Sequence, residues 1–269
     1  MSLSGKLTEL RRILGEMDSV LVAYSGGVDS AFLLKVSRDV LGDRAVAVTG
    51  VSEFMPRSEV AQARRLARLI KARHVLVNSA PPEAALKNPP QRCYYCKKSL
   101  FMSFKRIAIK MRLAYVADGS NVDDMKDHRP GNIACLELGV RSPLREAGIS
   151  KSDIRRMSKG LGLPTWNKPS EACLASRFPY GQRITPAGLA RVEAAEEYLK
   201  KFSADPVRVR MHGGIARIEV CYGDMPALFN DRASITRVLR KLGFSYITLD
   251  MEGYRQGAMN EESVWKRKR

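Results

Sequence analysis

Six consecutive residues near the N-terminus have the types expected of a loop that binds phosphate: Ser25, Gly26, Gly27, Val28, Asp29 and Ser30. They follow an apolar run and precede a helical pattern, which places the loop between a buried strand and the start of a helix. Adjacent glycines let backbone N–H groups close on an anion, the positive end of the helix dipole favours negative charge, and the two serines can donate hydroxyl hydrogens. We therefore predict a phosphate-binding loop.

Asp29 is the member of this loop that predicts a metal. A carboxylate at a phosphate site is repulsive unless a cation lies between the two groups, so we predict a nucleotide bound together with Mg2+. The segment is not a Walker loop, because it lacks the G-x-x-x-x-G-K-S/T pattern and ends without a lysine. The alternative is a simple glycine turn in which Asp29 or a serine caps the helix.

A second reactive group is predicted at Cys173. This cysteine lies in a segment bounded by proline and glycine and is flanked by Lys168, Arg177 and Arg183. Cationic neighbours favour the thiolate, which is the nucleophilic form of cysteine. We predict that Cys173 is a nucleophile with Arg177 beside it, and the alternative is an inert structural cysteine.

Arg208 and Arg210 are two residues apart in an expected strand, so their side chains would share one face. Arginines bind phosphate and carboxylate groups in bidentate fashion. We predict that they hold an anionic substrate, with Arg210 as part of the catalytic site. The alternative is that both contribute only to surface solubility.

Cys93 and Cys96 form a C-x-x-C in the expected loop before the third helix. Two cysteines at that spacing chelate a metal or form a redox pair. If Cys173 approached them, three thiolates could hold a 4Fe–4S cluster with one iron open to a sulfide, and Zn2+ is a further candidate for the same ligands. The alternatives are that Cys173 acts alone and that the C-x-x-C only packs. Cys135 lies in a loop-like stretch and Cys221 at the end of an expected strand, and both are interpreted as structural.

Strand and helix patterns alternate along the first part of the chain. Apolar runs predict strands at residues 20–24, 45–49, 74–77 and 114–117, and helical spacing predicts helices at 6–17, 57–72 and 97–111. This alternation predicts an α/β fold with a doubly wound parallel sheet, whose ligand binds at the carboxyl ends of the strands. Asp123 and Asp124 follow the fourth strand at that edge. We predict that Asp123 contributes to the nucleotide site, and a solvated turn is the alternative.

The C-terminal part of the chain has a different pattern. A helix capped by Ser150 ends near residue 161, and an irregular connector follows it. Beyond the connector we predict a helix, a β-hairpin that turns at 212–214, a further helix and a last strand. These patterns predict a nucleotide-binding domain at 1–165, a connector at 166–184 that carries Cys173, and a smaller α+β domain at 185–269.

Composition and charge limit the classes of partner. The 269 residues include 46 Lys and Arg against 28 Asp and Glu, a formal net charge of +18. Such a charge attracts nucleic acid or small anionic substrates, although part of it lies in solvated segments such as 64–71 and 266–269. The chain has neither an apolar run of about 20 residues nor a signal-peptide core, so we expect a cytoplasmic protein that does not enter membranes. The odd number of five cysteines argues against a disulfide framework, and we expect a homo-oligomer.

The loop and the turn at Asp123 resemble those of the PP-loop ATP pyrophosphatases, which cleave ATP between the α and β phosphates and pass AMP to a substrate oxygen. That resemblance implies ATP and Mg2+ as ligands and a HUP-like fold. Through SGGVDS, ELGVRSPLREAG, LGLPTW and CLASRFPYG, almost the whole chain resembles the LarE family of ATP-dependent sulfur transferases. These enzymes take part in synthesis of the nickel-pincer cofactor of lactate racemase. CLASRFPYG is the more specific match, because many enzymes share the PP-loop.

The resemblance implies a substrate and a reaction. Enzymes of this family adenylate a carboxylate of pyridinium-3,5-biscarboxylic acid mononucleotide, a small anionic molecule, and convert it to a thiocarboxylate. In the best-known members the sulfur comes from the cysteine at the position of Cys173, which is left as dehydroalanine. Members with three cysteines use a sulfide on an iron–sulfur cluster instead. Cys93 and Cys96 favour that route here, and a separate sulfur donor would then be a partner.

Two other functions stand as alternatives. A PP-loop tRNA thiolase would suit the net charge, but the C-terminal part has neither aromatic stacking pairs nor a recognisable RNA-binding motif, so nucleic acid is not the expected partner. A regulatory ATP-binding module would leave Cys173 and the C-x-x-C without a role.

Overall fold

The computed structural model describes residues 1–125, 130–169, 172–203 and 206–255. The basic segment 266–269 and residues 170–171 of the predicted connector lie outside these ranges. The chain divides into two compact units. Unit 1 comprises Met1–Ala85 and Gln91–Glu171, and unit 2 comprises Leu86–Pro90 and Ala172–Arg269.

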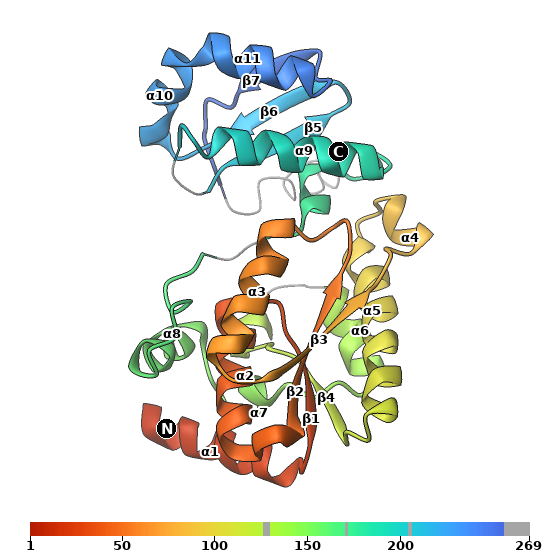
Figure 1. The fold of residues 1–269 in the computed structure, drawn as a ribbon, viewed down its shortest axis with the longest axis vertical. Coiled ribbons are helices and arrows are strands. Elements are labelled where there is room, and N and C mark those ends of the chain that lie inside the picture. Colours follow the sequence, from red (N-terminus) through yellow and green to blue (C-terminus); the bar gives the residue numbers. More distant parts are fainter. Residues whose placement is uncertain (126–129, 170–171, 204–205, 256–269) are drawn as a thin grey trace, which may run out of the picture. The chain divides into compact units, whose positions relative to one another are not determined.

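Unit 1 is built on a sheet of four parallel strands in the order β3-β2-β1-β4 (Figure 1). The strands are β1 (Val20–Ala23), β2 (Ala45–Val51), β3 (Arg73–Asn78) and β4 (Tyr115–Ala117). Val20 pairs with Ala45 of β2 on one side and with Tyr115 of β4 on the other. Because all four strands run the same way, the segments that follow them emerge at one edge of the sheet.

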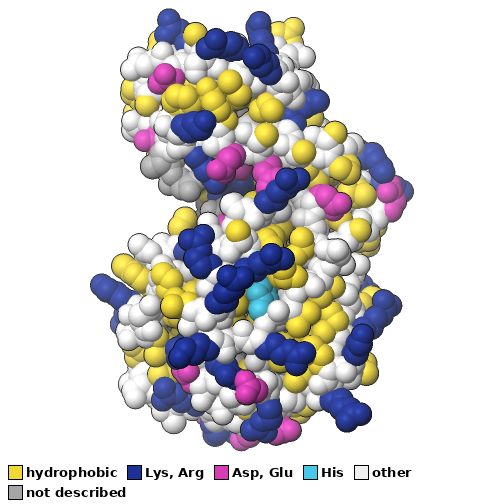
Figure 2. Space-filling view, in the orientation of Figure 1, with side chains coloured by type: hydrophobic (Ala, Val, Ile, Leu, Met, Phe, Trp, Pro, Cys, Tyr) yellow, Lys and Arg dark blue, Asp and Glu magenta, His cyan; other side chains and the backbone are white. Residues whose placement is uncertain are grey.

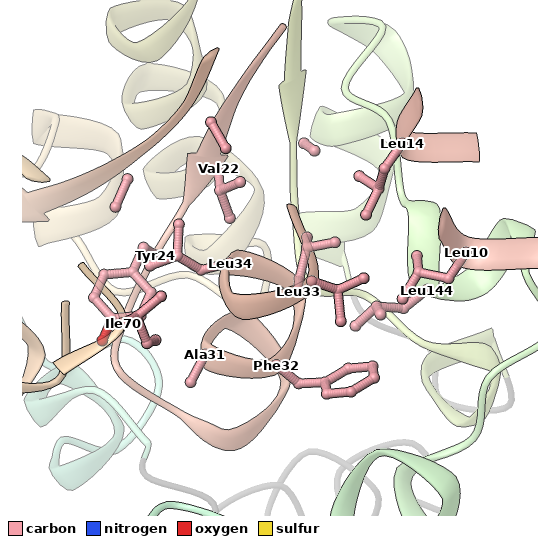
Figure 3. Packing of buried hydrophobic residues seen from close by; sticks show 14 of the residues in the cluster. Leu10, Leu14, Val22, Tyr24, Ala31, Phe32, Leu33, Leu34, Ile70 and Leu144 are labelled. Carbon is pink, nitrogen blue, oxygen red and sulfur yellow. The ribbon is translucent and has the colours of Figure 1, made fainter. Parts of the chain in front are cut away.

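Helices cover both faces of this sheet. Val20 and Val22 belong to an apolar cluster with Phe32, while Leu21 belongs to a second cluster with Phe104. Successive strand residues point to opposite faces, so the two clusters lie on the two sides of the sheet. Figure 3 shows part of the first cluster, in which side chains of α1, α2 and α7 meet. The predicted doubly wound parallel sheet is confirmed.

The helices of unit 1 are bounded as follows. They are α1 (Leu3–Glu16), α2 (Val28–Leu41), α3 (Arg57–Leu69), α4 (Glu83–Leu86, whose last residue falls in unit 2), α5 (Arg92–Lys110), α6 (Pro130–Glu137), α7 (Pro143–Glu146) and α8 (Lys151–Gly160), with short 3-10 turns at η1 (Gly42–Arg44) and η2 (Val122–Met125). The cluster beneath α1 and α2 takes in residues of α3, α7 and α8, and the cluster on the other face takes in residues of α5 and α6.

Two cysteine placements predicted from the sequence were wrong. Cys93 and Cys96 lie on the first turns of α5, which begins five residues before the predicted start at Lys97, and not in a loop. The apolar side chains that reveal this helix begin later, and Gln91 at its start makes no side-chain capping bond, so periodicity alone misses the first turns. Cys135 lies on α6, whose eight residues are too few to give a periodic signal.

Unit 2 is a small α+β unit with a three-stranded sheet in the order β5-β6-β7. Its elements are η3 (Leu174–Arg177), α9 (Pro186–Leu199), β5 (Arg208–His212), β6 (Ile215–Glu219), η4 (Tyr222–Asp224), α10 (Met225–Asn230), α11 (Arg232–Lys241) and β7 (Tyr246–Leu249). The strands β5 and β6 form the predicted antiparallel hairpin, and β7 pairs parallel to β6. The predicted α+β character is confirmed, and α9 packs against β5 while α11 packs against β7.

The surface of unit 1 is rich in cations. Lys and Arg side chains gather over the face that carries α3 (Figure 2). Glu59, the one acid of α3, bonds to Lys168 at 2.6 Å, and both side chains of that ion pair are largely buried. Within the described ranges, no helix has the length and apolar character needed to cross a lipid bilayer.

Candidate active site

The loop of residues 25–30 joins β1 to the start of α2. Gly27 caps α2, and in the described residues no side chain accepts from the first-turn N–H groups at this cap. Ser30 Oγ donates to the Gly27 carbonyl at 3.2 Å and accepts from Ser25 N at 3.2 Å, which closes the loop on itself. Gly26 has φ +77°, and a Cβ there would lie 3.1 Å from Ala63 of α3. The backbone donors of the helix start are therefore left for an anion.

Asp29 lies in the first turn of α2 and is coupled to α8. Lys151 Nζ donates to Asp29 Oδ2 at 2.5 Å. The other carboxylate oxygen, Oδ1, is buried and has no hydrogen-bond partner among the described residues. Burial raises the pKa of the Asp29 carboxyl, and the bond from Lys151 opposes that rise. A buried carboxylate oxygen without a donor fits the predicted cation, because Mg2+ prefers oxygen ligands.

Asp123 reaches the same lysine from the turn after β4. Its Oδ2 accepts from the backbone N of Lys151 at 2.8 Å. Ser150 and Asp153 form a capping box at the start of α8, which sets the position of Lys151. Lys151 therefore contacts Asp123 through its backbone and Asp29 through its side chain, and the structure brings these two predicted site residues together.

Sequence reasoning missed Lys151 itself. Its residue type and its place directly after a predicted N-cap at the carboxyl edge of the sheet were the signals that could have identified it. Gly119 in the turn after β4 also lies against the loop, since a Cβ there would be 3.0 Å from Ser30 N and 3.3 Å from Asp29 Cβ. The turn after β4 therefore packs directly on the first turn of α2.

Cys173 lies in unit 2 at the start of the short turn η3 and is exposed. Three donors converge on its backbone carbonyl oxygen. The backbone N of Ser176 lies at 2.9 Å, Ser176 Oγ at 2.8 Å and Arg177 Nη1 at 3.2 Å from that oxygen. Hydrogen bonds thus fix the backbone of Cys173, and the residue itself is exposed.

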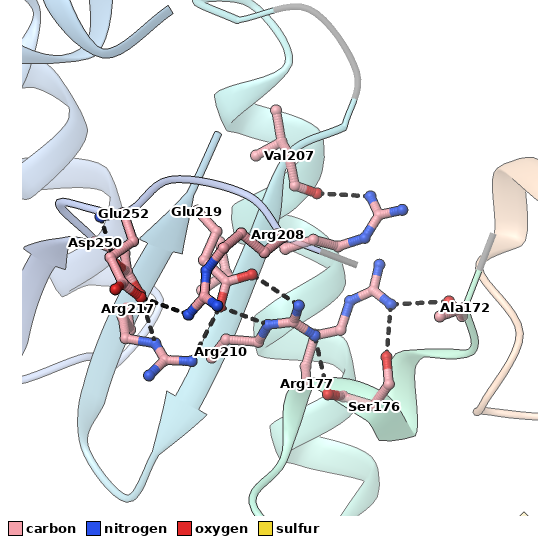
Figure 4. Close-up of polar contacts among 12 residues, drawn as sticks. Ala172, Ser176, Arg177, Val207, Arg208, Arg210, Arg217, Glu219, Asp250 and Glu252 are labelled. Carbon is pink, nitrogen blue, oxygen red and sulfur yellow. Dashed lines mark hydrogen bonds and ion pairs between the residues drawn. The ribbon is translucent and has the colours of Figure 1, made fainter. Parts of the chain in front are cut away.

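Arg177 and Arg210 lie at this turn, but both bind carboxylates of the protein. Arg177 is 1% exposed and donates to Glu196 of α9 through Nε at 2.8 Å and Nη2 at 3.0 Å. Arg210 is 5% exposed and donates to Glu219 of β6 through Nε at 3.0 Å and Nη2 at 2.7 Å. Arg210 Nη1 also reaches the carbonyl of Ser176 at 3.1 Å. Figure 4 shows the two arginines side by side around this turn.

Two further arginines belong to the same region of unit 2 (Figure 4). Arg208 is 4% exposed, donates from Nη1 to the Val207 carbonyl at 2.9 Å and lies 5.5 Å from the ring centroid of Tyr254. Arg217 donates to Glu219 at 3.0 Å. Arg217 also pairs with Asp250 at 3.4 Å, so the carboxylates of Glu196, Glu219 and Asp250 balance most of the guanidinium charge at this turn.

The three cysteines of the predicted cluster are divided between the units. Cys93 and Cys96 lie on α5 of unit 1, three positions apart and so on one helix face, and Cys173 lies in unit 2. Among the described residues, no group of three or more His, Cys, Asp or Glu is arranged to hold a metal. These residues therefore give no support to the cluster. Burial raises the pKa of the Cys135 thiol to about 11, which fits a structural cysteine.

A groove of about 430 Å³ lies outside both groups of residues. Its lining residues come from α3 and the end of β2, and they are Val51, Arg57, Val60, Ala61, Arg64, Arg65 and Arg68. None of them belongs to the loop of residues 25–30 or to the turn at Cys173. The groove adds to the positive field of unit 1.

Comparison with known proteins identifies relatives over the full length. No protein-family model matches the chain. An uncharacterised protein of Synechocystis sp. is 44% identical over 262 residues, which cover 96% of this chain and 98% of that protein. The pyridinium-3,5-bisthiocarboxylic acid mononucleotide synthase of Lactiplantibacillus plantarum is 40% identical over 266 residues, 97% of this chain and 95% of the synthase. A glutamine-hydrolysing GMP synthase of Chlamydia caviae is 23% identical over 212 residues, 71% of this chain and 40% of that enzyme.

Proposed function

This chain belongs to the family of the pyridinium-3,5-bisthiocarboxylic acid mononucleotide synthase, the LarE family, and we propose that it is an ATP-dependent sulfur transferase acting on pyridinium-3,5-biscarboxylic acid mononucleotide. The proposed reaction forms AMP and pyrophosphate and converts a carboxylate of that substrate to a thiocarboxylate. The observation that carries the proposal is the 40% identity to the synthase over 97% of the chain.

The first half of the reaction is assigned to the loop of unit 1. Backbone N–H groups at the start of α2, with Ser25 and Ser30, bind the phosphates of ATP. Asp29 and Asp123 would hold Mg2+, which would neutralise charge on the phosphates. The proposal is supported by the buried, unpartnered Oδ1 of Asp29. Transfer of AMP to the substrate carboxylate makes the carboxyl carbon electrophilic, because AMP is a good leaving group.

The second half is assigned to Cys173. Its exposed thiol attacks the acyl-adenylate, AMP leaves, and a thioester to Cys173 forms. Arg177 and Arg210 hold the turn that presents the thiol, since their guanidinium groups donate to backbone carbonyls of that turn and to buried glutamates. We therefore assign both arginines a positioning role at the turn that carries Cys173.

The test of this function is a turnover assay on the full chain. Wild-type protein with ATP, Mg2+ and the pyridinium biscarboxylate should release AMP and pyrophosphate and form the thiocarboxylate, measured by mass spectrometry. Cys173→Ala should still release pyrophosphate but form no thiocarboxylate. Cys221→Ala is the matched control, because it removes another exposed thiol of unit 2. ATP use that depends on bulk tRNA, with salt-sensitive tRNA binding, would instead identify a tRNA thiolase.

The source of the sulfur is tested in the same preparation. Protein purified without oxygen should contain neither iron nor labile sulfide, and the mass of Cys173 should fall by one H2S after a single turnover. Stoichiometric iron and sulfide together with an intact Cys173 would show that Cys93, Cys96 and Cys173 bind a cluster and that the cysteine is not consumed.

A further inference from the structure

We propose that the hydrogen bonds on the Cys173 carbonyl make its α-hydrogen acidic and so drive the release of sulfur from that residue. The inference rests on the proposed function, in which Cys173 gives up its own sulfur. In this proposal, Ser176 and Arg177 take part directly in the step that breaks the Cβ–S bond of Cys173. Neither role follows from the family relationship.

The carbonyl oxygen of Cys173 accepts more hydrogen bonds than the turn requires. A 3-10 turn needs only the bond from the backbone N of Ser176, which lies 2.9 Å from the Cys173 oxygen. The hydroxyl of Ser176 at 2.8 Å is an additional donor, and Nη1 of Arg177 is a weaker one at 3.2 Å, because its shortest bond goes to the Ala172 carbonyl at 2.8 Å. A carbonyl oxygen has two lone pairs, which the backbone N and the hydroxyl of Ser176 already fill.

The two additional donors are also coupled to each other. Arg177 Nη1 donates to Ser176 Oγ at 3.0 Å, and Ser176 Oγ donates to the Cys173 carbonyl. Two hydrogen bonds to Glu196 hold the guanidinium group of Arg177 in place. Glu196 in turn accepts a hydrogen bond from the backbone N of Val209. A fixed positive charge thus polarises the hydroxyl, and the hydroxyl polarises the carbonyl.

The chemistry that follows is a β-elimination. Once Cys173, an exposed residue, carries the thioester, hydroxide or another solution base removes its α-hydrogen. The C–H electron pair becomes the Cα–Cβ double bond, the Cβ–S bond breaks, and sulfur leaves as the thiocarboxylate anion. Cys173 remains as dehydroalanine, the base carries the proton away, and no oxidant or reductant takes part.

The carbonyl oxygen receives charge during this step. As the α-hydrogen leaves, the developing negative charge is shared between Cα and the carbonyl oxygen as an enolate. Donors fixed on that oxygen before reaction bind the enolate more strongly than the neutral carbonyl, which is the principle of an oxyanion hole. The Ser176 hydroxyl is therefore expected to act on elimination and not on formation of the thioester, whereas Arg177 also holds the turn for the first step.

The test follows single turnovers of the full chain by rapid quench and mass spectrometry of the peptide containing Cys173. Ser176→Ala keeps the backbone bond of the turn and removes only the hydroxyl. We expect it to form the thioester at the wild-type rate and to form dehydroalanine about 10²-fold more slowly, so that the thioester accumulates. Ser176→Thr should restore the rate. Ser234→Ala, which removes a hydroxyl from α11, is the matched control.

Isotope labelling distinguishes an effect on proton removal from an effect on the conformation of the turn. Protein made with α-deuterated cysteine should show a primary isotope effect on dehydroalanine formation and none on thioester formation. If Ser176→Ala slows both steps equally, or slows neither, the bonds only shape the turn and the proposal is overturned while the proposed function stands. If wild-type Cys173 keeps its mass after turnover, the sulfur route of the proposed function fails, and this proposal fails with it.

Discussion

Lys151 and Asp29, which are 122 positions apart in the sequence, lie with Nζ and Oδ2 at 2.5 Å. Each residue comes from the first turn of a helix at the carboxyl edge of the sheet of unit 1, Asp29 from α2 and Lys151 from α8. The pair joins the loop of residues 25–30 to the second half of the unit. The other oxygen of the Asp29 carboxylate, Oδ1, is buried and has no hydrogen-bond partner among the described residues.

Replacing Lys151 tests whether this lysine serves ATP. Lys151→Met should lower the rate of pyrophosphate release by roughly tenfold or more, equivalent to about 1.4 kcal/mol of lost transition-state stabilisation, because it removes a cation beside the phosphates. Lys159→Met is the matched control, since Lys159 is on the same helix and contacts the Trp166 ring. Equal rates in both variants, with unchanged thermal unfolding, would remove Lys151 from the site.

The raised pKa of Asp29 has a defined effect on stability. The folded protein holds the Asp29 proton to higher pH than the unfolded chain does, so unfolding releases a proton in the interval between the ordinary and the raised pKa. The free energy of unfolding therefore falls as pH rises through that interval. Urea titrations from pH 3 to 7 should show this contribution in the wild type and not in Asp29→Asn.

Binding of ATP with Mg2+ should show the opposite pH dependence. The metal needs the ionised carboxylate, so affinity should weaken as pH falls through the raised pKa of Asp29. Asp29→Asn should bind Mg2+-ATP weakly at every pH. Asp39→Asn, which changes an exposed carboxylate at the other end of α2, is the control. A pH-independent affinity in the wild type would exclude Asp29 as a metal ligand.

The ion pair between Arg210 and Glu219 is buried, and its removal tests how the turn at Cys173 is held. Glu219→Leu leaves the guanidinium of Arg210 without its carboxylate and should cost about 3–5 kcal/mol of stability. The double variant Arg210→Met with Glu219→Leu should recover a large part of that loss, because neither charge is then buried alone. Chemical unfolding measures both. Glu197→Gln, at an exposed pair on α9, should leave the midpoint close to wild type.

Gly119 tests the packing of the turn after β4 on the loop. A methyl group there would lie 3.0 Å from Ser30 N, so Gly119→Ala should displace the start of α2 and raise the KM for ATP several-fold. Gly160→Ala is the control, because a Cβ there meets none of the described atoms within 4 Å. This substitution at the end of α8 should stabilise the protein by about 0.4–1 kcal/mol. An unchanged KM in Gly119→Ala would separate this turn from the nucleotide site.

Much of the fold follows from local sequence. The alternation of apolar runs with helical patterns predicted the parallel sheet, and the hairpin around Gly213 and the cap at Ser150 were visible in neighbouring residues. The loop of residues 25–30 was identified for the same reason, because its glycines, serines and carboxylate act within one strand-loop-helix segment. Such features depend on backbone preferences and periodicity, which a few adjacent residues determine.

The partners of the charged groups were decided only by the tertiary structure. Arg177 was expected beside the Cys173 thiolate and Arg210 was expected to bind substrate, but the fold brings Glu196 and Glu219 to them from α9 and β6. Likewise, Lys151 meets Asp29 only after the chain has passed through β2, β3 and β4 and brought α8 against α2. Residue type shows that a charge needs a partner when it is buried, whereas the identity of that partner depends on contacts between segments far apart in the chain.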